Sequence, residues 1–139
     1  MEHAITVETF VNASPEKVWL DFTNPDAIKV WNTASDDWHT TYAENDLRVG
    51  GHFSSRMEAK DGSAGFDFNG VYDEVVTYER LAYTMEGGRK VSIDFIPEHD
   101  GVRVVESFEP ETENTHELQR AGWQSILDTF KRYAEGTHS

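Results

Sequence analysis

The sequence predicts an α+β domain in which a curved antiparallel sheet wraps around one long C-terminal helix. Between residues 36 and 111, short segments with alternating apolar and polar residues follow one another through Gly- and Asp-containing turns, as in an antiparallel meander. Residues 115–134 carry apolar side chains at helical spacing. A sheet with one apolar face needs a cover, and this helix is the only predicted element large enough to provide it.

The N-terminal part predicts one strand and two short helices. Residues 3–12 alternate in the way expected of a half-buried strand. A helix is expected in 13–23 with Ser14 as N-cap, and a second in 24–31 with Asn24 as N-cap. Each N-cap is followed by a proline, which is favoured at the first helical position.

The middle of the chain predicts the strands of the meander. Gly50-Gly51 and Gly70 are places where the sheet is expected to bend or bulge. The predicted strand segments, with their turns, are 36–45, 50–62, 65–76, 80–86, 89–101 and 101–111.

The C-terminal helix contains a glycine beside a tryptophan. Trp123, Leu127 and Phe130 lie on its apolar face. Gly122 costs roughly 0.5–1 kcal/mol relative to alanine in a helix interior. We expect this cost to be offset by a close approach of the helix backbone to a neighbouring element; the alternative is a tolerated glycine on an exposed face.

Composition limits the classes of function. The 139 residues suffice for a single domain, here taken as 1–139. The 26 acidic and 12 basic residues give a net charge of −14, which repels nucleic acid and anionic lipid surfaces. There is no cysteine, and we find no signal peptide and no apolar run of membrane-spanning length. We therefore expect a cytoplasmic protein that does not insert into membranes.

Four segments resemble a known family. They are VNASPEKVWLDFTNPDAIKVW, DLRVGGHF, FDFNGVYDEV and QRAGWQSILDTF. Together they are similar to the Aha-type family, homologues of the activator of a heat-shock chaperone ATPase, within the START-like (SRPBCC) superfamily. The resemblance covers roughly residues 5–134, and its most specific part is the Gly-Trp pair before the apolar helix.

The resemblance implies the helix-grip fold, with a deep cavity between the sheet and the long helix. Superfamily members bind sterols, lipids, polyketides and plant hormones there, and a few are cyclases or components of hydroxylating enzymes. The eukaryotic activator has a further N-terminal domain that anchors it to the chaperone. We expect 139 residues to leave no room for that domain.

Strand alternation and helix spacing predict which residues face the cavity. Glu106 is in phase with Val104 and Phe108, so it points inward if the strand is regular; a strand edge or bulge would turn it outward. His116 and Gln119 continue the Trp123 stripe as a polar rim. The predicted ligand-binding residues are Phe53, Met57, Phe66, Phe68, Tyr72, Tyr83, Phe95, Glu106, Phe108, His116, Gln119, Trp123 and Leu127.

No motif singles out a reaction or a cofactor. The histidines do not form a metal-binding spacing, and no P-loop, nucleophile elbow or dinucleotide loop is present. An acid–base pair of Glu106 with Tyr72 or His116 is conceivable. We therefore predict a protein that binds a small apolar or amphipathic molecule without metal or cofactor. A cyclase- or hydrolase-like enzyme is the alternative, and a chaperone-activator-like interaction module is the second.

Overall fold

A computed structural model describes residues 4–33 and 35–137. The chain begins with strand β1 (Ile5–Val11), which is followed by helix α1 (Pro15–Thr23) and helix α2 (Pro25–Trp31). His3, included in the predicted first strand, lies outside the described residues. None of the helices within the described ranges is long and apolar enough to cross a membrane.

The seven strands form one antiparallel sheet in the order β1-β7-β6-β5-β4-β3-β2. Only β1 is out of sequence order, because it pairs with the last strand after two helices have intervened. The remaining strands are β2 (Trp38–Asn45), β3 (His52–Ala59), β4 (Gly65–Val76), β5 (Arg80–Met85), β6 (Lys90–Glu98) and β7 (Gly101–Phe108).

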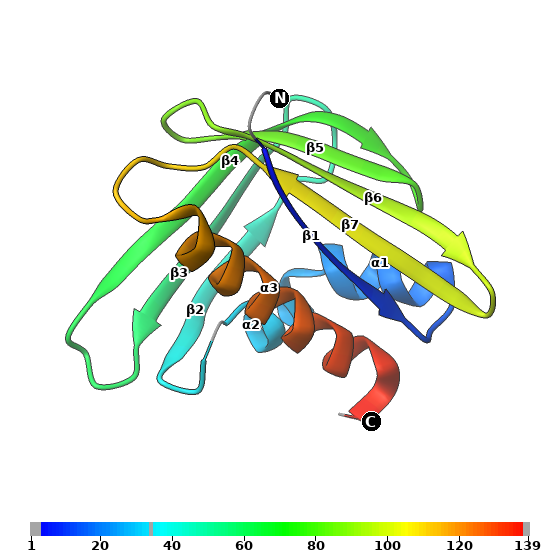
Figure 1. The fold of residues 1–139 in the computed structure, drawn as a ribbon, viewed down its shortest axis with the longest axis horizontal. Helices are drawn as coiled ribbons and strands as arrows, with labels where there is room; N and C mark the ends of the chain where they lie inside the picture. The colour runs from blue at the N-terminus through cyan, green and yellow to red at the C-terminus, as the bar shows by residue number, and fades with distance from the viewer. Residues whose placement is uncertain (1–3, 34, 138–139) are drawn as a thin grey trace.

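Helix α3 (His116–Arg132) crosses the concave side of the curled sheet, and α1 and α2 lie toward one end of it (Figure 1). The chain then makes one π-helical turn, Tyr133–Thr137. α3 packs against β1, and α2 packs against β2 at the other sheet edge. The predicted fold class, a curved sheet gripping the C-terminal helix with two short helices after the first strand, is confirmed.

The helix starts follow the local chemistry that the sequence indicated. The side chain of Ser14 accepts a hydrogen bond from the Lys17 amide, and that of Asn24 accepts one from the Asp26 amide. Thr115 caps α3 by accepting from the Leu118 amide. Each cap satisfies one of the backbone donors that a helix start leaves unpaired.

The bulges of the sheet do not lie at the glycines where a bend or bulge was predicted. Gly50 has a φ of +83° in the turn before β3, which agrees with the expected bend. Gly70, however, continues the ladder without a break, opposite Phe53 on β3 and Met85 on β5. The register shifts lie at Thr41 in β2 and Asp73 in β4. The role of Gly70 is steric, because a Cβ there would lie 2.5 Å from the Phe53 ring.

The prediction that Gly122 lets the backbone of α3 come close to a neighbouring element is also wrong. Apart from its two chain neighbours and the backbone of its own helix, a Cβ built on Gly122 meets no atom within 4 Å. The position of its Cβ is therefore open, as the alternative interpretation required, although Gly122 itself is half-buried and not fully exposed.

Candidate functional site

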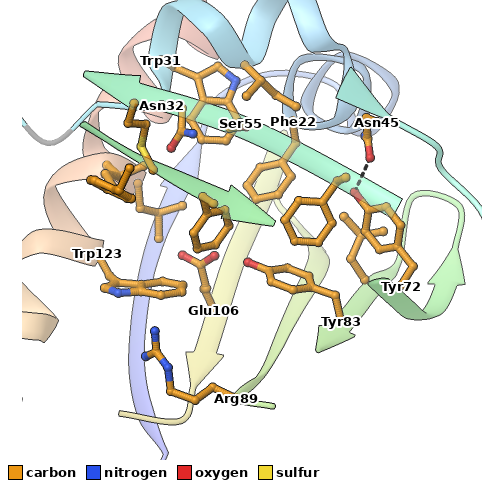
Figure 2. Close-up of a pocket in the computed structure, with 18 of the residues that line it drawn as sticks. Phe22, Trp31, Asn32, Asn45, Ser55, Tyr72, Tyr83, Arg89, Glu106 and Trp123 are labelled. Carbon is orange, nitrogen blue, oxygen red and sulfur yellow. Dashed lines mark hydrogen bonds between the residues drawn. The ribbon is translucent and has the colours of Figure 1, made fainter. Parts of the chain in front are cut away.

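A cavity of about 330 Å³ lies between the concave face of the sheet and the helices (Figure 2). The sheet, α3 and the first two helices all contribute to its wall, and most of the lining side chains are apolar. The lining residues are Phe22, Ile28, Trp31, Asn32, Glu44, Asn45, Phe53, Ser55, Met57, Phe66, Phe68, Tyr72, Leu81, Tyr83, Arg89, Glu106, Glu111, Asn114, Gln119, Trp123, Ile126 and Leu127.

Aromatic rings from β3, β4 and β5 contact one another along the sheet wall. The Phe53 ring meets the Tyr83 ring edge-on, with centroids 4.7 Å apart, and tilts against Phe68 and Tyr72. Such edge and tilted arrangements suit the charge distribution of the rings. On the helix side, Trp123 of α3 stacks on Phe108 of β7 at 3.9 Å with an interplanar angle of 9°. The rings hold one another in place, so the wall is preformed.

One corner of the cavity is fixed by hydrogen bonds from side chains. The Tyr72 hydroxyl donates to the side-chain oxygen of Asn45 at 2.6 Å (Figure 2). Asn45 in turn donates to the backbone carbonyl of Thr23 at the end of α1. Burial raises the pKa of Tyr72 to about 12, against the opposing effect of this hydrogen bond. Tyr72 is therefore a neutral positioning group, already engaged, and a weak candidate for proton transfer.

Glu106 is a carboxyl group inside the apolar cavity. It lies in β7 opposite Val7 of β1 and Ile93 of β6, so its sheet neighbours are apolar. Its residue is 8% exposed, and its carboxyl points into the cavity between Trp123 and Tyr83 (Figure 2). Burial raises its pKa from 4.5 to about 8; no hydrogen bond or charge from the described residues opposes that shift. The inward orientation predicted from strand phase is confirmed.

Tyr83 and Arg89 lie at the same end of the cavity as Glu106 and interact electrostatically. Burial raises the pKa of Tyr83 well above 10, and Glu106 and Tyr72 raise it further while Arg89 opposes them. The Arg89 guanidinium donates to the backbone carbonyl of Glu109. Among the described lining residues, Arg89 is the one basic side chain. Chemically, the site offers a protonatable carboxyl and a phenol within an aromatic enclosure.

The structure brings most of the predicted site residues together. The predicted residues that line the cavity are Phe53, Met57, Phe66, Phe68, Tyr72, Tyr83, Glu106, Gln119, Trp123 and Leu127. Phe66 is 48% exposed and packs on Trp38, so its place is at the rim. Whether these residues bind a ligand stays a prediction.

Three predicted residues lie outside the lining, and one that lies within it has a different task. Phe95 packs edge-on against Trp19 and Phe22 of α1 in the core. Phe108 is fully buried behind Trp123, and His116 is exposed in the first turn of α3. These three placements correct the prediction.

Gln119 lines the cavity, but its amide is engaged by the loop that precedes α3. Its side-chain oxygen accepts from the Glu111 amide, and its nitrogen donates to the carbonyls of Glu111 and Asn114. The predicted polar rim therefore holds the loop before α3 in place, and Glu106 is the buried carboxyl that is free to meet a ligand.

The prediction missed residues that other elements bring to the cavity. Ser55 is in phase with Phe53 and Met57, so the alternation of β3 could have identified it. Trp31 reaches the cavity from α2, and its indole nitrogen donates to the Asp21 carbonyl. Arg89 follows the β5–β6 turn, where no periodicity gives a direction. Within the described residues, no group of three or more potential ligands is placed to hold a metal ion.

The fold and its cavity define a helix-grip protein of the START-like class, whose architecture is generally of the ligand-binding type. The family model for "Activator of Hsp90 ATPase homolog 1-like protein" matches residues 12–135. The chain therefore belongs to this family. No curated protein matches the chain significantly.

Solved structures agree with this assignment. An AHSA1-like protein from Aeromonas hydrophila is 47% identical with a TM-score of 0.91, and the match covers 97% of this chain and 94% of that one. Chr148 from Cytophaga hutchinsonii is 50% identical with a TM-score of 0.84 over the same shares. The Aha1 dimer from Colwellia psychrerythraea, at 16% identity and a TM-score of 0.73 over 98% of both chains, shows the fold alone.

Proposed function

We propose that this protein binds a small amphipathic molecule in the cavity between the sheet and α3. The observation that carries the proposal is an unfilled volume of about 330 Å³ with an aromatic wall and one buried, unpaired carboxyl. Small-molecule sites are typically apolar clefts of this order of size with a few polar groups that orient the ligand. The net charge of −14 argues against nucleic acid as the partner. We propose the cytoplasm as the location, which fractionation of the source cells would test.

A titration with fatty acids, flavonoids and sterols tests the proposal. Binding is followed through tryptophan fluorescence, because Trp31 and Trp123 line the cavity, and through amide chemical shifts. We expect shifts at the inner face of the sheet and along α3. If every compound leaves these residues unperturbed, the binding proposal is wrong.

Two neighbouring serines of β3 provide a matched pair of variants. Ser55 is buried and lines the cavity, whereas Ser54 hydrogen-bonds to Asn69 and is absent from the lining. Ser55→Phe places a ring in the cavity and should abolish binding. Ser54→Phe places the same ring on the other face of the strand and should leave binding unchanged. Equal affinity in both variants would locate the ligand elsewhere.

Catalysis is the second candidate function, and the observation that favours it is the buried carboxyl beside Tyr83. A carboxyl with a pKa of about 8 stays protonated near neutrality and can serve as a general acid. The predicted pairs with Tyr72 and His116 are not favoured, because Tyr72 is bonded to Asn45 and His116 is exposed. If a turnover is found, Glu106→Gln should reduce its rate by roughly 10²–10⁴. Unchanged turnover would remove Glu106 from the mechanism.

A further inference from the structure

The polar partner that the cavity lacks is a cation. A carboxylate removed from water requires a counter-charge or several hydrogen bonds. Glu106 has apolar neighbours on both adjacent strands, and burial is the one cause that shifts its pKa. No fully enclosed polar side-chain atom is left unbonded among the described residues, so the Glu106 oxygens remain open to the cavity space. The group is therefore accessible to a ligand and unsatisfied by the protein.

The surroundings of Glu106 also favour a positive ligand group. The Trp123 ring lies on one side of the carboxyl and the Tyr83 hydroxyl points toward it from the other (Figure 2). The negative face of an aromatic ring attracts an ammonium group, and a phenol oxygen can accept a hydrogen bond from one. Two other acidic residues, Glu44 and Glu111, line the same cavity. The one basic lining residue, Arg89, is engaged by the Glu109 carbonyl and acts on Tyr83.

We infer that the ligand is an apolar amine whose ammonium group lies on the Glu106 carboxylate between Trp123 and Tyr83, with its hydrocarbon part along the aromatic wall. This inference rests on the proposed function and specifies its ligand class. The net charge of −14 adds attraction for a cation at long range.

Binding of such a ligand must release a proton from the protein near neutral pH. The ammonium needs the ionised form of Glu106, whereas the empty cavity favours the protonated form. The two lining phenols are not expected to supply that proton, because Tyr72 and Tyr83 titrate far above neutrality.

The test compares three probes of equal chain length: octylamine, 1-octanol and octanoate. Affinities are measured by calorimetry near pH 7 with the full chain and with Glu106→Gln. We expect octylamine to bind roughly 10- to 100-fold more tightly than octanol, as a charge-assisted contact allows. In Glu106→Gln this preference should disappear, and a native-like amide spectrum verifies that the variant is folded.

A proton count and a charge control complete the design. Titrations in two buffers of different ionisation heat should give close to one proton released per octylamine. Octyltrimethylammonium, which carries no proton to lose, should give the same count. Glu79→Gln removes one charge from the exposed β4–β5 turn and should preserve the preference for the amine.

The outcomes separate the inference from the proposed function. Equal affinity for octylamine and octanol overturns the amine but leaves an apolar binding cavity. Tightest binding of octanoate, lost in Arg89→Gln, overturns the amine in favour of an acid held by Arg89. A preference for the amine that Glu79→Gln also removes would assign it to net charge, and would overturn the role of Glu106. If none of the probes binds, both the inference and the proposed cavity function fail.

Discussion

Glu106 keeps its acidic side chain in a place where ionisation is costly. Because burial raises its pKa from 4.5 to about 8, the folded protein holds this proton over a pH range in which the unfolded chain has lost it. At this group the native state therefore binds more protons than the unfolded state between about pH 4.5 and pH 8, so the contribution of Glu106 to the free energy of unfolding falls as the pH rises through that window.

Replacement of Glu106 by glutamine should remove this dependence on pH. Glutamine keeps the shape and cannot ionise, so Glu106→Gln should gain stability over the wild type with rising pH. The gain should be larger at about pH 8.5 than at about pH 5.5 by roughly 2–3 kcal/mol. Urea melts at the two pH values measure the difference. An equal stability difference between Glu106→Gln and the wild type at both pH values would mean that Glu106 titrates normally in the folded state.

Gly122 is a second residue for which the structure predicts whether a substitution stabilises or destabilises the protein. Since nothing lies within 4 Å of the position of a Cβ, alanine fits without displacing a neighbour. Gly122→Ala should stabilise the protein by about 0.5–1 kcal/mol, because alanine has the higher helix propensity and reduces the entropy of the unfolded chain. A raised urea midpoint at unchanged m-value is the expected result. A lowered midpoint would revive the close approach of α3 to a neighbouring element.

At the scale of elements, Gly70 links the β3–β4 pair to the cavity wall. A Cβ at Gly70 would lie 2.5 Å from the Phe53 ring and 2.9 Å from the Thr84 carbonyl oxygen. Gly70→Ala should therefore destabilise the protein by about 1–3 kcal/mol through overpacking, opposite in sign to Gly122→Ala. Because the ring of Phe53 contacts Phe68, Tyr72 and Tyr83, its displacement should also shift their resonances. A stable variant with an undisturbed Phe53 ring would contradict this account.

Elements with strong local signals could be predicted from the sequence. The caps at Ser14 and Asn24 depend on neighbouring residues alone, and both formed as expected. Strand phase was sufficient to point Glu106 inward, since β7 is regular along its length. Such signals fixed most of the fold and much of the sheet wall of the cavity.

The errors arise where the packing of distant elements decides the outcome. Phe95 has the correct phase for the concave face, yet α1 covers it with Trp19 and Phe22. Phe108 is likewise covered by Trp123. Alternation gives the face on which a side chain lies, but it does not say which part of that face a helix covers. The bulge at Asp73 depends on pairing with β5 and has no glycine to mark it.

At the scale of the whole molecule, the excess of acidic side chains affects stability. The 12 basic residues are outnumbered by 26 acidic ones, and ion pairs such as Arg80–Asp94 and Arg103–Glu98 lie at or near the surface. Exposed pairs of this kind contribute about 0–1 kcal/mol each. The remaining acidic side chains repel one another, and this repulsion is smaller in the expanded unfolded chain. Self-repulsion should therefore destabilise the compact state at low ionic strength.

Salt should stabilise the protein at constant pH. Raising NaCl from about 0.01 M to about 0.15 M shortens the Debye length from about 30 Å to about 8 Å, which screens distant charges more than close ion pairs. We expect a gain on the order of 1 kcal/mol in urea melts near pH 7, because the unpaired acidic excess outweighs the loss from the surface pairs. Glu106→Gln should keep this response, since its carboxyl is buried and mostly protonated at that pH. Loss of stability with NaCl would mean that the surface ion pairs outweigh the repulsion. A salt response abolished in Glu106→Gln would place an ionised Glu106 at the centre of that repulsion, contrary to its raised pKa.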